Sequence, residues 1–77
     1  MFVAETKDLG RLVKSLREKL GLSQEKLAAR LGVTFSSVNR WENGHTKPSP
    51  LAVQKLEELV FELGPAGKEM SDEFFGN

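Results

Sequence analysis

Four side chains with different binding chemistry share one face of a short predicted helix at residues 34–43. They are an aromatic ring, a hydroxyl, an amide and a guanidinium, carried by Phe35, Ser36, Asn39 and Arg40. Spacings of three and four residues place all four on one side of a helix, whereas Val38 and Trp41 fall on the apolar side. Such a mixed face suits recognition of a partner through hydrogen bonds and apolar contacts.

Catalysis explains the polar residues of this chain poorly. Ser36 and Ser37 have no basic partner beside them, and the lone His45 supplies neither a histidine cluster for a metal nor a credible triad. The glutamates within residues 57–62 fall on the outward side of a predicted helix with no cleft implied. There is no cysteine and no Gly-rich phosphate loop. The sequence therefore predicts no enzyme, no metal site and no cofactor.

The elements that position these side chains are predicted to be helices throughout. Apolar residues recur at helical spacing in four segments, residues 7–20, 24–31, 34–43 and 50–63. Thr6, Ser23, Thr34 and Ser49 precede them as candidate N-caps, and Pro50 suits a first helical position. We expect the core face to comprise Leu9, Leu12, Val13, Leu16, Leu20, Leu27, Leu31, Val33, Val38, Trp41, Leu51, Leu56, Leu59, Val60 and Leu63. The fold class is all-α.

The second and third predicted helices meet at a short turn. Two helices joined by three or four residues must cross steeply, so their contact needs a small side chain, and Ala28 supplies it. Gly32 supplies the residue that tolerates positive φ at the reversal. Together these features indicate a helix-turn-helix.

Charge is segregated along a chain whose formal net charge is zero. Residues 1–56 carry ten Lys or Arg and five Asp or Glu, a net charge of +5, whereas residues 57–77 carry one Lys and six acidic residues, −5. With 77 residues we expect one domain at 1–64 and an acidic C-terminal tail at 65–77. No signal peptide or membrane span is predicted, so a cytoplasmic location is expected.

The stretch "LGLSQEKLAARLGVTFSSVNRWENGHTKPSP" resembles the helix-turn-helix of the Cro and phage-repressor-like (XRE) family. The resemblance covers roughly residues 8–63 and rests on "LSQEKLA", the Gly32 turn and "WENG". It implies a compact lambda-repressor-like bundle of four to five short helices, whose third helix enters the major groove of double-stranded DNA. It further implies a bacterial or phage transcriptional regulator at the nucleoid, a repressor that binds an inverted-repeat operator as a homodimer.

The resemblance also assigns roles to individual residues. Those implied to contact bases are Phe35, Ser36 and Arg40, with Asn39 as an adjacent reader. Those implied to hold DNA phosphates are Gln24, Thr34, Asn43 and Lys47. Arg40 can bind guanine O6 and N7 together, whereas a phenyl ring at Phe35, where many relatives have glutamine, can only pack on thymine methyls or fold back onto the protein.

Family members often hold an arginine of the first helix against the glutamate of the "ENG" turn. Arg17 and Glu42 match those positions, and such a pair would fix the orientation of the third helix. Its contribution depends on burial, from ~0 to 1 kcal/mol when exposed to ~3 to 5 kcal/mol on loss of one buried partner. A phosphate-facing Arg17 is the alternative.

The acidic tail leaves a second function open. Met70, Phe74 and Phe75 are apolar residues in this segment. They could dock on the domain as a short fifth helix, form a dimer contact or engage a protein partner. The last possibility would suit an antitoxin-like or adaptor module that uses the same fold for protein interaction.

Overall fold

Five helices and no strand make up the part of the chain that the computed structural model describes, which is the backbone of residues 6–75 and the side chains of residues 9–72. The helices are α1 (Thr6–Leu20), α2 (Gln24–Leu31), α3 (Phe35–Glu42), α4 (Pro50–Glu62) and α5 (Pro65–Phe75). The all-α prediction is confirmed, and each predicted helix is present with its ends within one residue of the expected position.

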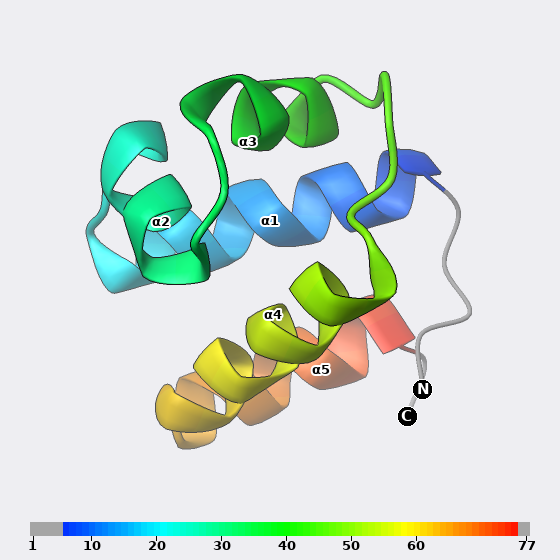
Figure 1. Ribbon diagram of the computed structural model, residues 1–77. Coiled ribbons are helices and arrows are strands. Elements are labelled where there is room, and N and C mark those ends of the chain that lie inside the picture. The colour runs from blue at the N-terminus through cyan, green and yellow to red at the C-terminus, as the bar shows by residue number, and fades with distance from the viewer. Residues whose placement is uncertain (1–5, 76–77) are drawn as a thin grey trace.

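The first helix, α1, runs through the centre of the molecule. Figure 1 shows α3 on one side of it and α4 with α5 on the other. The expected stripe on α1 faces these neighbours, since Leu9, Leu12, Val13 and Leu16 are buried and Leu20 packs at the edge of the core. The helix begins at Thr6, whose predicted capping side chain lies outside the described residues.

The short helices begin and end at the residues that their local chemistry predicts. The hydroxyls of Ser23, Thr34 and Ser49 each accept a hydrogen bond from the backbone N–H three residues later, the N-cap arrangement that satisfies an otherwise unpaired donor. Gly32 takes the left-handed conformation, with φ 72°, and ends α2. The three capping predictions and the turn prediction are therefore confirmed.

Helix α4 departs from the prediction at its first turn. Its buried residues are Ala52, Leu56, Leu59 and Val60, whereas Leu51, which we expected in the core, is 63% exposed. The reason is rotational: one residue is about 100° of a helical turn, so once Ala52 faces the core Leu51 must point aside. The prediction for Leu51 is wrong.

The fifth helix packs on α1 and α4. Met70 is its buried anchor, at 1% exposure, and joins the same core as the α1 and α4 side chains. A Cβ on Gly67 would overlap the carbonyl oxygen of Val60, so α5 and α4 approach closely at this point. The side chains of Phe74 and Phe75 lie outside the described residues.

Candidate functional site

The turn between α2 and α3 fixes the angle at which α3 is presented. Ala28 is buried at the crossing, and its carbonyl accepts a hydrogen bond from the N–H of Val33 at 3.0 Å. Lys55 of α4 donates from Nζ to the carbonyl of Leu31 at 3.3 Å, which satisfies part of the α2 C-terminus. This last contact was not predictable from sequence patterns, because it joins residues of two separate helices.

One face of α3 is buried and the opposite face is exposed. Val38 and Trp41 lie in the core at 0% and 6% exposure. Phe35 is 48% exposed, and Ser36 and Arg40 are exposed as well. The phenyl ring of Phe35 therefore keeps about half of its surface free instead of folding back into the core. An aromatic ring, a hydroxyl and a guanidinium are available on the outer face of α3 for contact with a partner.

A glycine allows α3 to lie close to α1. A Cβ on Gly10 would overlap the carbonyl oxygen of Trp41, so any larger residue there would force the two helices apart. Sequence reasoning missed Gly10. The available signal was a glycine inside an amphipathic helix, where it costs about 1 kcal/mol relative to alanine and so suggests a packing reason.

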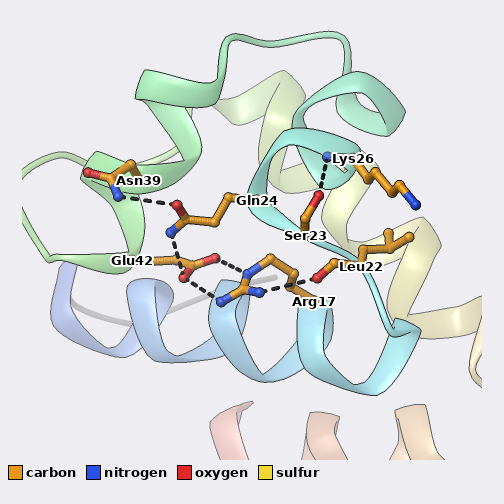
Figure 2. Close-up of polar contacts among 7 residues, drawn as sticks. All are labelled: Arg17, Leu22, Ser23, Gln24, Lys26, Asn39 and Glu42. Carbon is orange, nitrogen blue, oxygen red and sulfur yellow. Dashed lines mark hydrogen bonds and ion pairs between the residues drawn. The ribbon is translucent and has the colours of Figure 1, made fainter.

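Arg17 of α1 and Glu42 of α3 form a two-pronged ion pair, shown in Figure 2. Nε donates to Oε2 at 2.8 Å and Nη2 donates to Oε1 at 3.1 Å, while Nη1 donates to the carbonyl of Leu22 at 3.2 Å. The side chains are 18% and 5% exposed, so the pair is mostly shielded from water. The hydrogen bond to Glu42 raises the pKa of Arg17, and its guanidinium stays charged.

The amide of Gln24 extends this pair toward the outer face of α3. Its Nε2 donates to Glu42 Oε1 at 3.0 Å, and its Oε1 accepts from Asn39 Nδ2 at 3.2 Å (Figure 2). Asn39 Oδ1 in turn accepts from Asn43 Nδ2 at 3.1 Å. The structure thus brings together five of the residues singled out in the sequence. Gln24 and Asn39, which we expected to face DNA, have partners within the protein.

The remaining predicted phosphate contacts lie at the ends of α3. Thr34 is exposed, but its hydroxyl already caps the helix and contacts the Ser37 hydroxyl at 3.0 Å. Asn43 is the exposed C-cap residue, and Lys47 is exposed in the loop that follows. The exposed cations Arg40 and Lys47 therefore lie on α3 and just beyond its C-terminus.

The side of the molecule formed by α4 and α5 carries different surface chemistry. The glutamates of residues 57–62 are exposed, as are Glu69 and Asp72. No group of three or more His, Cys, Asp or Glu among the described side chains could hold a metal ion. No helix within residues 6–75 is both long and apolar enough to cross a membrane. This acidic surface lies across α1 from α3.

Comparison with known protein families gives a match to one of them. The family model described as helix-turn-helix matches residues 13–60, which includes α2, the turn and α3. No solved structure matches this chain.

Relatives with similar sequences carry related names. A protein of Methanothermobacter thermautotrophicus named an uncharacterized HTH-type transcriptional regulator is 31% identical over 64 residues, 83% of this chain and 84% of that protein. Proteins of the same description from Sinorhizobium medicae and Rhizobium meliloti are each 31% identical over 52 residues, 68% of this chain. The aligned stretch spans only 37% of the length of those two proteins, so the chain covers little more than a third of each.

Proposed function

This chain belongs to the XRE-type helix-turn-helix family, and from that premise we propose that it is a sequence-specific transcriptional regulator that binds double-stranded DNA. The observation that carries the proposal is the outer face of α3. It is exposed and chemically mixed, and it is held at a fixed angle by the turn at Gly32 and by the Arg17–Glu42 pair. In this proposal α3 enters the major groove, which is wide enough to admit a helix.

Base recognition is assigned to the exposed side chains of α3. Arg40 can donate to both O6 and N7 of one guanine, a pairing worth about 1 to 3 kcal/mol of discrimination. Phe35 packs on a thymine methyl group, which is the only major-groove feature that suits a hydrocarbon ring. Ser36 lies beside Phe35 and one turn before Arg40 and can donate or accept at a base edge.

Contacts with the DNA backbone are assigned to the polar residues at the ends of α2 and α3. Gln24 keeps one amide hydrogen beyond the bond to Glu42 and lies at the α2 N-terminus, where helical N–H groups favour an anion. Thr34, Asn43 and Lys47 lie near the two ends of α3. Phosphate contacts from these residues set the register of α3 without reading the sequence.

The biological role completes the proposal. We assign the protein to the cytoplasm of a bacterium or phage-infected cell, at the nucleoid, as a homodimer on an inverted-repeat operator. Two copies of α3 then reach two half-sites whose centres lie about 10 base pairs apart. Occupancy of such an operator would block transcription, so repression is the regulatory outcome that we propose.

In vitro selection from a random duplex library tests the proposal directly. We expect the protein, at near-physiological salt, to enrich an inverted repeat with half-site centres about 10 base pairs apart. A selection that yields no shared sequence, with only weak salt-sensitive binding, would contradict sequence-specific regulation.

Two substitutions test the division of roles. Arg40→Ala should relax the preference at one base pair in each half-site, with a loss there of about 1 to 3 kcal/mol. Lys47→Ala, which also removes one exposed cation, should weaken binding to all duplexes by a similar factor. Quantitative binding to a panel of single-base operator variants separates the two patterns, and uniform losses for both substitutions would refute the assignment.

A protein-interaction module of the antitoxin or adaptor kind is the second candidate. The observation that favours it is apolar surface on α4, where Leu51 is 63% and Phe61 is 88% exposed. Exposed apolar surface marks a docking site where it is contiguous, and in this proposal a partner would cover these side chains. Feeble binding to every duplex, together with undiminished association with a protein partner, would favour this function.

A further inference from the structure

The three helices of the candidate site share one connected series of polar side chains. It contains Arg17 from α1, Gln24 from α2, and Glu42, Asn39 and Asn43 from α3. Four of the five are drawn in Figure 2, where the amide of Gln24 lies between Glu42 and Asn39. From Arg17 the series runs through Glu42, Gln24 and Asn39 to Asn43. Beyond the ion pair, each neighbouring pair of side chains is joined by a single hydrogen bond of 3.0 to 3.2 Å.

The carboxylate of Glu42 dictates how each amide in this series is turned. An ionised carboxylate can only accept hydrogen bonds, so Gln24 must present its NH₂ group to it. The oxygen of Gln24 then faces Asn39, which must answer with its own NH₂ group. The oxygen of Asn39 is left for the NH₂ group of Asn43. The charge on Glu42 therefore orders donors and acceptors across three residues.

Both polar atoms of Asn39 therefore hold one partner each within the protein, which fixes the orientation of its amide. Recognition of adenine by asparagine uses the amide oxygen and the amide nitrogen together on one base edge. To present those two atoms to a base, the Asn39 amide would have to turn away from the partners that hold it, which would disturb its bonds to Gln24 and Asn43. It is also partly buried, whereas Phe35, Ser36 and Arg40 are exposed.

We propose that Asn39 is a positioning residue that holds α3 against the start of α2 through Gln24, and that it does not read a base. The inference rests on the proposed function for its DNA component. Its structural component, the order imposed by Glu42, concerns the free protein. Base preference then depends on Phe35, Ser36 and Arg40, and Asn39 sets how firmly they are presented.

The order of the amides supplies a test in the free protein. Asn39→Asp replaces a donor with an acceptor facing the oxygen of Gln24, and Gln24 cannot turn over because Glu42 also only accepts. We expect the equilibrium constant for folding to fall about tenfold, the size of one amide–amide hydrogen bond lost with one group left unpaired. Denaturant unfolding at constant pH and salt measures this change.

Glu42→Gln should rescue the damage from Asn39→Asp. With glutamine at position 42, Gln24 can turn over, accept from that amide and donate to the new carboxylate at position 39. Every bond of the series can then re-form except the one that Arg17 Nη2 donates to the side chain at position 42. The double variant also has the same net charge as the unaltered protein. In the Glu42→Gln background we expect Asn39→Asp to lower the equilibrium constant for folding by less than about threefold.

Simple repulsion between carboxylates at positions 39 and 42 is the competing explanation of such a rescue. The Gln24→Ala background distinguishes the two, because it removes the connecting amide and leaves the two charges in place. The coupling between positions 39 and 42 is the amount by which Glu42→Gln reduces the cost of Asn39→Asp. Under our proposal this coupling falls sharply in the Gln24→Ala background. If the coupling keeps its full size without Gln24, or if Asn39→Asp costs nothing in the unaltered protein, the proposed role of the series is overturned.

The DNA component is tested with Asn39→Ala, which keeps a good helix former on α3. Selection and operator-variant binding should show an unchanged base preference and an unchanged salt dependence, with a uniform loss of affinity. A relaxed preference at one base pair would make Asn39 a reader and overturn the proposal. If the unaltered protein selects no sequence at all, the proposed function fails. The unfolding measurements on the single and double variants at positions 39 and 42 still decide the role of the amide series.

Discussion

The side chain of Arg17 shows how one residue can orient a whole helix through contacts within the protein. Its three donor groups reach both oxygens of Glu42 and the carbonyl of Leu22, so it connects α1 to α3 and to the start of α2. Its pKa is raised, chiefly by the hydrogen bond to Glu42. A cation whose pKa is higher in the folded state contributes its full stability below its ordinary pKa, and the contribution is lost as the pH rises from that value through the folded-state pKa. Arg17 therefore remains charged throughout the neutral range.

Arg17→Ala should lower the free energy of unfolding by about 3 kcal/mol, because it leaves the carboxylate of Glu42 shielded from water without its cation. Arg30→Ala is the matched control. Arg30 also pairs with a glutamate, Glu62, but at 3.4 Å with side chains 45% and 59% exposed. Its loss should cost at most ~1 kcal/mol. Chemical denaturation of both variants makes the comparison, and equal costs would show that shielding of the Arg17 pair has no energetic effect.

At the scale of helices, close backbone approach is as important as side-chain packing. Gly10 lets α1 lie directly against the last turn of α3, and Gly67 does the same for α5 against α4. Each glycine sacrifices helix propensity, yet each lies where a methyl group would overlap a carbonyl oxygen of the neighbouring helix. The two glycines act on opposite sides of the molecule, so their effects can be separated.

Gly10→Ala should destabilise the protein by about 1 to 3 kcal/mol, although alanine is the better helix former, because the added methyl group pushes α3 away from α1. Trp41 is the only tryptophan and is buried at this contact, so its fluorescence emission should change. Gly67→Ala should also lower stability, but the emission of Trp41 should remain as in the unaltered protein. An unchanged stability for Gly10→Ala would mean that the helices separate without cost.

Local chemistry made most of the helices predictable. Caps such as Ser23 and the reversal at Gly32 depend on neighbours in sequence, so the pattern alone located them correctly. Leu51 was misplaced because apolar character does not define the rotation of a helix to within one residue. The bond between Gln24 and Asn39 was not predictable, since it exists only once α2 and α3 are packed together. The DNA roles of the exposed α3 residues remain predictions that rest on family resemblance.

At the scale of the whole molecule, the acidic end of the sequence forms most of α4 and α5, although Glu62 of α4 also pairs with Arg30 of α2. The acidic residues of α4 and α5 lie across α1 from α3, as Figure 1 shows for the helices that carry them. A chain with no net charge can therefore still present a cationic surface around α3.

The salt dependence of binding should reveal how many phosphates this surface contacts. Four contacts in each half-site would give a log–log slope of affinity against salt near −7 for a dimer and about half that for a monomer. Fluorescence anisotropy of a labelled operator across a salt series measures the slope. A slope near zero with tight binding would contradict a DNA interface built on phosphate contacts.

The separation of charge has a further consequence for the approach to DNA. A neutral molecule with opposite charges on two faces behaves as a dipole, and the field of the duplex turns it as it diffuses inward. Encounters that begin with α4 and α5 foremost are repelled, and those with α3 foremost are attracted. The association rate constant should therefore exceed that of an uncharged protein of the same size at low ionic strength, and it should fall toward the unsteered value as salt is added.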